Sequence, residues 1–162
     1  MQPIDWSTFR LRINIDTSIE EIFNCLNTRV GIERWFLASA VFKDGAGTKS
    51  SNLPIAPGDT YEWMWHGSDY VAKGDVLENN GLDRIAFTFE GCQVAIQIKV
   101  EDGVHIVELV QSEIPTDEPS KKQKHVGCSS GWTFYKANLK SVLEGGLDLR
   151  NKDAGIKSVI NS

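Results

Sequence analysis

Apolar and polar residues alternate along the first patterned segment of the chain, from Trp6 to Asp16. Phe9, Leu11 and Ile13 are separated by single polar residues, which is the period of a strand with one buried face. A strand is therefore expected here, and its apolar face should contact the core.

Two short helices are predicted directly after this strand. In the first, apolar residues recur at i, i+3, i+4 and i+7, and Thr17 or Ser18 provides the N-cap. The second covers residues 28–36 and carries Trp35-Phe36 at its tip.

A run of strands is predicted in the middle of the chain. Ala38 to Phe42 is expected to be a strand, and residues 44–51 and 54–58, rich in Gly, Ser, Asn and Pro, an irregular loop. Five closely spaced strand candidates follow, and Asp102-Gly103 is the strongest hairpin signal between them. Because parallel strands need longer connections, these strands should form an antiparallel meander. The five are Thr60 to His66, Tyr70 to Glu78, Arg84 to Phe89, Gln93 to Glu101 and His105 to Glu113.

A long helix is predicted near the C-terminus, opening at Gly131-Trp132. Gly145-Gly146 supplies its stop signal. Residues 115–127 are polar and break the pattern before it, and the basic run from Lys121 to His125 is interpreted as a solvated loop. The apolar residues that share one stripe of the helix are Cys128, Trp132, Tyr135, Leu139 and Val142.

The composition is that of one ordinary globular domain. With 162 residues, 41% hydrophobic and 24% charged, the chain can bury a substantial core, and residues 1–162 are expected to form a single domain. The net charge of −5 disfavours nucleic acid as a partner, since phosphate binding needs clustered Lys and Arg. The chain has neither a secretory signal pattern nor an apolar run that could span a membrane, so we expect a cytoplasmic location. The three cysteines show no disulfide pattern and are expected to be free.

No catalytic or metal-binding motif stands out. The three histidines lie outside nucleophile motifs, and the chain has no Gly-x-Ser-x-Gly elbow, phosphate-binding loop or zinc helix. His125 and Cys128 have ligand-like spacing, but a zinc site needs three or four protein ligands. We therefore expect no metal, no cofactor and no catalytic residue, and the interpretation leans away from an enzyme without excluding one.

Two of the predicted strands carry aromatic faces. Tyr61, Trp63 and Trp65 share one face, and Phe87 and Phe89 share a face of another strand. Such side chains either fill a core or line the apolar wall of a small-molecule pocket. The sequence leaves both interpretations open.

The register of the strands decides whether their polar residues face solvent or the pocket. If the aromatic residues face inward, Glu62 and His66 face solvent, whereas an inverted register would place this pair in the pocket. Asp75, Glu108 and Gln111 are further polar candidates on neighbouring strands. None is favoured as a site residue, because most carboxylates are solvated.

Three short sequences accompany this order of elements: Trp35-Phe36, Gly131-Trp132 and Leu-Glu-Gly-Gly at 143–146. Together with the order of elements, they make the chain resemble the START-like (Bet v 1-like, SRPBCC) superfamily. More narrowly, it is similar to the group related to the C-terminal domain of the activator of Hsp90 ATPase. The resemblance implies an α+β helix-grip fold. In that fold a curved antiparallel sheet of about six or seven strands wraps around the long C-terminal helix and leaves a cavity between them.

The leading hypothesis is that this cavity binds a small hydrophobic or amphipathic molecule. Two alternatives stay open: a stand-alone co-chaperone in the stress response that stimulates an Hsp90-type ATPase, and a cavity-based enzyme resembling cyclases or dehydratases of the superfamily. The sequence specifies neither the ligand nor the oligomeric state. The residues predicted to bind the ligand are Trp35, Phe36, Tyr61, Trp63, Trp65, Phe87, Phe89, Trp132 and Tyr135.

Overall fold

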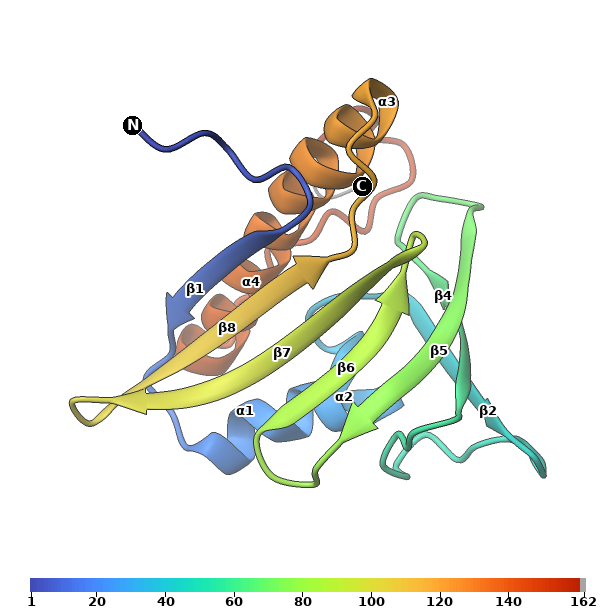
Figure 1. The fold of residues 1–162 in the computed structure, drawn as a ribbon. Helices are drawn as coiled ribbons and strands as arrows, with labels where there is room; N and C mark the ends of the chain where they lie inside the picture. The colour runs from blue at the N-terminus through green and yellow to red at the C-terminus, as the bar shows by residue number, and fades with distance from the viewer. Residues whose placement is uncertain (161–162) are drawn as a thin grey trace.

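The computed structural model describes residues 1–160 and contains an antiparallel eight-stranded sheet with its longer helices on one face (Figure 1). The strand order is β1-β8-β7-β6-β5-β4-β2-β3. The first strand, β1 (Phe9–Asn14), pairs with the last, β8 (Val104–Ser112). The α+β class, the antiparallel sheet and the long C-terminal helix are therefore confirmed.

Two short helices follow β1, as predicted. Helix α1 (Ile19–Asn27) begins after Ser18, whose hydroxyl accepts a hydrogen bond from the backbone N–H of Glu21. Helix α2 (Arg29–Glu33) ends before Trp35 and is shorter than expected. A Cβ atom at Gly31 would lie 1.9 Å from the carbonyl oxygen of Asn24. Glycine is therefore required where α2 approaches α1 this closely.

The meander is formed by hairpin neighbours. Asp102 and Gly103 have φ values of 49° and 79°, as a two-residue type I′ turn requires, so the predicted hairpin is confirmed. One strand was not expected: β3 (Gly47–Thr48) pairs with β2 within the segment predicted as loop. The remaining strands are β2 (Ser39–Asp44), β4 (Thr60–Met64), β5 (Val71–Asn79), β6 (Arg84–Phe89) and β7 (Cys92–Glu101).

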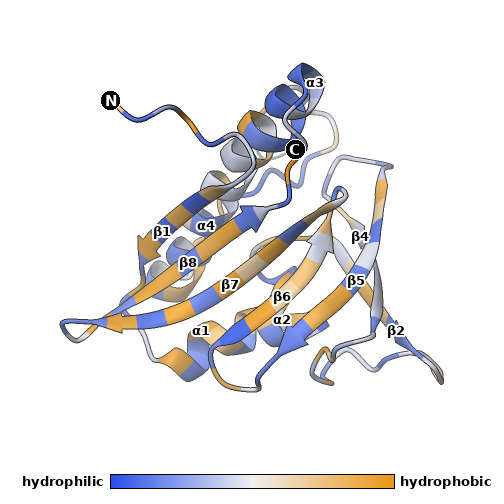
Figure 2. Ribbon diagram, in the orientation of Figure 1, coloured by the Kyte–Doolittle hydropathy of each residue, from blue (hydrophilic) through white to orange (hydrophobic). Residues whose placement is uncertain are grey.

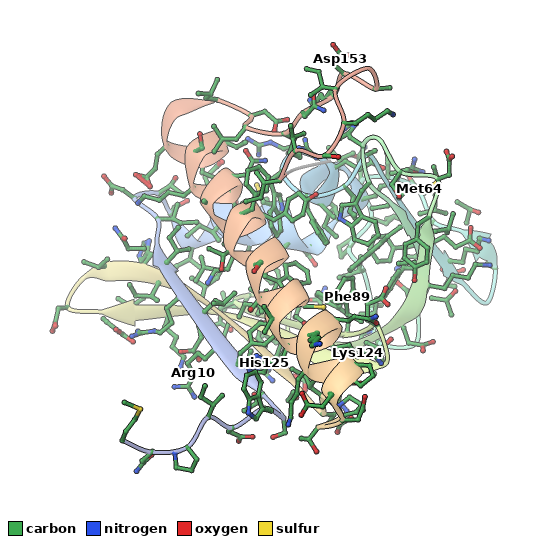
Figure 3. The ribbon with its side chains drawn as sticks, turned by 90° about the horizontal axis from the view of Figure 1, so that it is seen from above. Arg10, Met64, Phe89, Lys124, His125 and Asp153 are labelled. Atoms are coloured by element: carbon green, nitrogen blue, oxygen red, sulfur yellow. The ribbon has the colours of Figure 1, made fainter. Side chains whose placement is uncertain are left out.

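Strand β4 settles the register of the aromatic face. Trp63 is 2% exposed whereas Met64 is 38% exposed, and Figure 3 shows Met64 at the edge of the molecule. Glu62 lies on the outer side, where its carboxylate pairs with Lys43 at 3.2 Å and Lys73 at 3.5 Å. The inverted register is therefore excluded. Bands of hydrophobic and hydrophilic residues alternate along the strands in the same way (Figure 2).

The helical region before α4 (Cys128–Gly145) is longer than predicted. Residues expected to be a polar loop form α3 (Glu118–Ser120) and a π-helix, η1 (Lys121–Gly127), which continues directly into α4. The loop interpretation of the basic run from Lys121 to His125 is therefore wrong. The helical region begins after Asp117, whose side chain accepts a hydrogen bond from the backbone N–H of Ser120 at 3.0 Å. Pro119 lies in its first turn, where proline is favourable.

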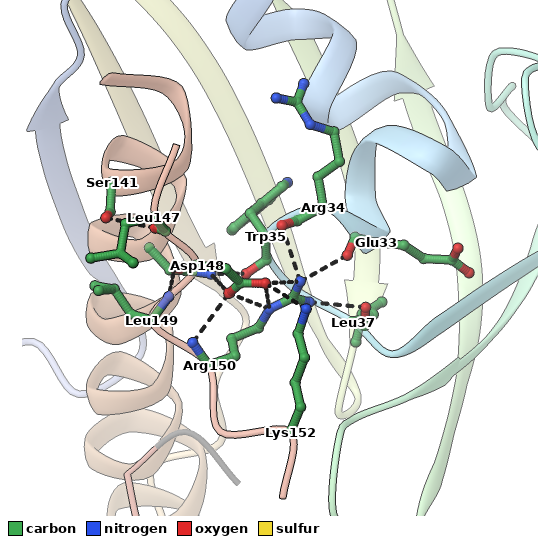
Figure 4. Close-up of polar contacts among 11 residues, drawn as sticks. Glu33, Arg34, Trp35, Leu37, Ser141, Leu147, Asp148, Leu149, Arg150 and Lys152 are labelled. Atoms are coloured by element: carbon green, nitrogen blue, oxygen red, sulfur yellow. Dashed lines mark hydrogen bonds and ion pairs between the residues drawn. The ribbon is translucent and has the colours of Figure 1, made fainter. Parts of the chain in front are cut away.

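The segment after α4 returns to the turn that follows α2. The buried guanidinium of Arg150 donates to the carbonyl oxygens of Glu33, Arg34 and Leu37, each at 3.0 Å, and pairs with Asp148 (Figure 4). We call these contacts of Arg150 the Arg150 clasp. They connect the segment after α4 to the turn that carries the predicted Trp35-Phe36 tip. Within residues 1–160, no helix is both long and apolar enough to cross a membrane.

Candidate functional site

An aromatic cluster fills the space between the sheet and α4, and Phe36 lies at its centre. The Phe36 ring centroid is 4.8 Å from that of Trp132, 4.9 Å from Tyr135 and 5.5 Å from Trp63. Trp35, Trp65, Phe87, Phe89 and Tyr61 are joined to the same cluster through further ring contacts. The structure thus brings all nine predicted residues together. Eight are buried, and Trp65 is partly exposed.

Hydrogen bonds fix two of the indoles in this cluster. Trp132 Nε1 donates to the Gln111 side-chain oxygen at 3.1 Å, and Trp35 Nε1 donates to the carbonyl oxygen of Cys25 at 2.8 Å. Gln111 is completely buried. The amide therefore serves to orient Trp132, a role that the sequence did not indicate.

The interior beneath α4 is almost completely packed. A cavity there is lined by aromatic and aliphatic side chains, including Trp35, Trp63 and Phe87, but its volume is only about 10 Å³. Such a space holds one water molecule at most. A ligand cannot occupy this interior unless side chains move.

A space larger than this cavity is the mouth groove at the N-terminal end of α4, with a volume of about 370 Å³. We define this mouth groove by its aromatic wall and its polar rim. Phe89 and Lys124 lie next to each other there in Figure 3. The aromatic wall consists of Phe36, Trp65, Tyr70, Phe89, Trp132 and Tyr135, and the rim includes Glu90, Gln123, Lys124 and Cys128.

The rim offers polar contacts but little reactive chemistry. The Tyr70 hydroxyl donates to the Glu90 carboxylate at 3.0 Å, and this bond raises the pKa of Tyr70. Burial raises the pKa of the Cys128 thiol, so the thiolate is disfavoured at neutral pH. Lys124 contributes an ammonium group to the rim. These groups can orient a polar end of a molecule whose apolar part contacts the aromatic wall.

The other polar candidates lie away from the groove. Glu108 is buried on the outer face of the sheet, where its carboxylate pairs with Lys99 at 2.7 Å and Arg12 at 3.4 Å. The hydrogen bond from Lys99 lowers the pKa of Glu108. His125 hydrogen-bonds to the carbonyl oxygen of Thr8 at 3.0 Å. Among residues 1–160, no cluster of three or more His, Cys, Asp or Glu side chains could hold a metal ion.

Five of the nine predicted residues border the mouth groove; Tyr61, Trp35, Trp63 and Phe87 do not. Seven groove residues were not predicted: Gln123, Lys124 and Gly127 from the unexpected η1, Cys128 and Gly131 from α4, and Tyr70 and Glu90 from other parts of the chain. Lys124, Cys128, Gly131 and Tyr135 recur at i, i+4, i+7 and i+11. Extending the helical stripe upstream of Cys128 would have placed Lys124 on the same face.

Comparison with known proteins identifies the family. Residues 16–144 match the family model described as Activator of Hsp90 ATPase homolog 1-like protein. No curated protein matches the chain.

Solved structures similar to this chain support the fold. The protein SSP2350 from Staphylococcus saprophyticus has a TM-score of 0.70 and 19% identity over 88% of this chain and 96% of its own. The Aha1 dimer from Colwellia psychrerythraea has a TM-score of 0.65 and 19% identity over 86% and 97%. DynU16, from the dynemicin biosynthetic locus, has a TM-score of 0.68 and 16% identity over 90% of this chain and 50% of its own. At these identities the similarity establishes the fold alone, whereas the family match covers most of the chain. The chain belongs to the family of Activator of Hsp90 ATPase homolog 1-like proteins.

Proposed function

We propose that this protein binds a small hydrophobic or amphipathic molecule in the mouth groove. The observation that carries the proposal is an open space of about 370 Å³ with an aromatic wall, in which Tyr70 is 56% exposed. This volume lies within the usual range for small-molecule pockets, about 300–1,000 Å³. Exposed aromatic surface gathered in one concave place is typical of a binding site.

The groove provides both parts of an amphipathic contact. Trp65 and Phe89 provide apolar surface whose removal from water favours binding by about 25 cal/mol per Å². Glu90 and Lys124 lie at the rim, where they can contact a polar group that remains near solvent. The ligand would therefore lie across the N-terminal end of α4, above the packed interior.

Gly131 allows a direct test. It borders the groove, and a Cβ atom placed on it meets no heavy atom within 4 Å. Gly131→Leu should therefore fill the groove without disturbing the fold, and leucine favours a helix over glycine by about 1 kcal/mol. The probe is 1-anilinonaphthalene-8-sulfonate, followed by its fluorescence. We expect saturable binding to the wild type and at least roughly tenfold weaker binding to Gly131→Leu, since the probe would lose most of its apolar contact area.

The matched control is Gly145→Leu, at the last residue of the same helix. A Cβ atom there also meets nothing within 4 Å, and Gly145 does not border the groove. Its probe affinity should equal that of the wild type. Equal binding to wild type and Gly131→Leu, or no saturable binding at all, would refute the proposed site.

A second candidate function is stimulation of an Hsp90-type ATPase, which the family match over residues 16–144 favours. A cytoplasmic location, expected from the sequence, is compatible with this role. The test adds the purified protein to an Hsp90-type ATPase and measures ATP turnover. A dose-dependent increase would support the co-chaperone function, and an unchanged rate at saturating protein would remove it.

An enzymatic function has less support from the site. The side chains that line the inner cavity are aliphatic or aromatic and include no ionisable group, whereas general acid–base catalysis needs a titratable group beside the reacting atom. In the mouth groove, the charged side chains Glu90 and Lys124 lie at the rim and are not part of the aromatic wall that would contact the ligand. We therefore favour binding over catalysis.

A further inference from the structure

Two side chains of opposite charge border the mouth groove without an ion-pair partner. Glu90 comes from the turn between β6 and β7, and Lys124 comes from η1. Lys121, three residues before Lys124, pairs with Glu118 at 2.7 Å. Among residues 1–160, by contrast, neither Glu90 nor Lys124 forms an ion pair, either with each other or with another side chain.

The two charges lie on the same side of the groove. A Cβ atom placed on Gly91, the neighbour of Glu90, would lie 3.5 Å from Lys124 Nζ. Figure 3 shows Lys124 beside Phe89, the residue before Glu90. The ammonium group of Lys124 therefore lies next to the turn that carries the Glu90 carboxylate.

The Cys128 thiol, which also borders the groove, is near both charges. Burial is the main cause of its raised pKa, and the Glu90 carboxylate raises this pKa further whereas the Lys124 ammonium lowers it. Because charge effects weaken with distance, both groups lie close to this part of the groove wall.

Both charges still have room for further hydrogen bonds. The Glu90 carboxylate accepts one from the Tyr70 hydroxyl at 3.0 Å, but a carboxylate can accept about four. A lysine ammonium offers three donors. Both side chains are only partly exposed, and a charge partly withdrawn from water is stabilised by a counter-charge. A ligand that brings these counter-charges would therefore be favoured.

A ligand with a single charge would satisfy only half of this rim. An anion would gain from Lys124 but would be repelled by Glu90, and a cation would meet the reverse situation. A head group with one charge of each sign pairs with both. At the rim such a head group also keeps part of its hydration, which limits the cost of desolvation.

We propose that the ligand of this protein is an amphipathic zwitterion, whose apolar body contacts the aromatic wall while its carboxylate pairs with Lys124 and its ammonium group with Glu90. The inference rests on the proposed function and specifies the ligand class for the same site. The ring of Tyr70, which is 56% exposed and hydrogen-bonds to Glu90, provides an aromatic face for the ammonium group as well.

Three ligands with the same naphthyl body test the proposal. They are 3-(2-naphthyl)alanine, which is a zwitterion at pH 7, 3-(2-naphthyl)propionate, which lacks the ammonium group, and 2-(2-naphthyl)ethylammonium, which lacks the carboxylate. Affinities are measured by calorimetry at pH 7. We expect the wild type to bind the zwitterion at least roughly fivefold more tightly than either other ligand. The reason is that each of these lacks one ion pair, worth a factor of about two to five near solvent, and leaves the opposing charge unmatched.

Two variants assign each charge of the ligand to its partner. Lys124→Met should weaken the zwitterion and the propionate roughly two- to fivefold and leave the ethylammonium no weaker. Glu90→Gln keeps an acceptor for the Tyr70 hydroxyl and should weaken the zwitterion and the ethylammonium by a similar factor. The matched control is Lys122→Met, in the same basic run but exposed and not bordering the groove. It should leave all three affinities unchanged.

The outcomes distinguish the inference from the proposed function. If the anilinonaphthalene probe binds and responds to Gly131→Leu, but the zwitterion is not preferred or none of the three ligands binds, the groove stands and the zwitterion is refuted. Tightest binding of the propionate would indicate an anionic ligand instead, and tightest binding of the ethylammonium a cationic one. A preference for the zwitterion that survives both Lys124→Met and Glu90→Gln would also overturn the assignment. Failure of the probe and of all three ligands would overturn both proposals.

Discussion

Lys136 of α4 donates a hydrogen bond from its Nζ to the carbonyl oxygen of Leu11, 125 residues earlier in the chain, at 2.6 Å. One turn later, Lys140 donates to the carbonyl oxygen of Asn14 at 2.7 Å. Leu11 and Asn14 belong to β1, which is an edge strand of the sheet. Unpaired backbone groups on an edge invite pairing with another chain. The two lysines therefore attach the long helix to β1 and also occupy backbone carbonyl groups of this edge that could otherwise pair with another chain.

The first prediction concerns the protonation of Lys136. Burial lowers the pKa of Lys136 to about 7, whereas a lysine in the unfolded chain titrates near 10.4. Between these values the unfolded state binds more protons, so this lysine makes stability rise with pH above 7. Below pH 7 both states are protonated, and its contribution is unfavourable and constant. We expect the gain to approach, as an upper bound, about 1.4 kcal/mol per pH unit.

Urea unfolding of the wild type and of Lys136→Met at pH 6, 7, 8 and 9 measures this effect. The variant minus wild-type difference in unfolding free energy should be constant from pH 6 to 7 and fall steadily above pH 7. Burial raises the pKa of Cys25, which gives the opposite slope, but this thiol is present in both proteins and cancels. If the difference in unfolding free energy between the two proteins stayed constant from pH 6 to 9, the lowered pKa of Lys136 would be contradicted.

The second prediction concerns the Arg150 clasp. Arg150→Ala leaves the carbonyl oxygens of Glu33, Arg34 and Leu37 without the donor that Arg150 provides, and it removes the more buried of the two cations that pair with Asp148. We expect a loss of about 2–4 kcal/mol in unfolding free energy, measured by urea titration. Arg150→Lys should recover little of it, because one ammonium cannot reproduce the planar fork of a guanidinium.

Lys152→Ala is the matched control for the clasp. Its ammonium pairs with the same Asp148 at 3.0 Å, but its side chain is 54% exposed. Exposed ion pairs contribute about 0–1 kcal/mol, so this variant should be close to the wild type in stability. Similar losses for the two variants would show that the tail binds through charge rather than through the buried hydrogen bonds.

Local patterns predicted most of the fold because most of its elements have a clear hydrophobic period. The alternation at Phe9, Leu11 and Ile13 identified β1, and Asp102-Gly103 identified the last hairpin. The π-helix at Lys121–Gly127 was missed because none of its side chains is fully buried. A helix without a buried stripe has no hydrophobic period to detect, and only the Asp117 cap marked its beginning.

The position of the candidate site was predicted only in part. An aromatic face at Trp63 and Trp65 was evident from strand alternation, but which part of it is open depends on how the sheet and the helices pack together. Phe36 fills the interior, so the available space shifts to the mouth groove. The rim of the mouth groove combines Glu90, from a turn, with Lys124, from a helix that was predicted as a loop because its residues are polar. Such long-range juxtapositions have no signature in a single local window.

The third prediction concerns the contact between Gly74 and Tyr61. The two residues are paired across β4 and β5, and the Tyr61 ring lies over Gly74, so that an added Cβ atom would be 2.5 Å from its Cζ and hydroxyl oxygen. The ring cannot retreat, because it stacks on Trp63 at 3.8 Å and its hydroxyl donates to the carbonyl oxygen of Thr88. We expect Gly74→Ala to lower the unfolding free energy by about 1–3 kcal/mol, the usual cost of overpacking.

A double-mutant cycle with Tyr61→Leu shows whether the clash is the cause. In the Tyr61→Leu background the clash with the ring is removed and only the Thr88 hydroxyl, 2.7 Å from the added Cβ atom, remains close. Part of the cost of Gly74→Ala should therefore disappear, with a coupling energy of roughly 1 kcal/mol. Gly45→Ala, where a Cβ atom meets nothing within 4 Å, should change stability little. Additive effects of Gly74→Ala and Tyr61→Leu would mean that alanine at position 74 acts on the β5 backbone, and that the Tyr61 ring does not require a glycine beneath it.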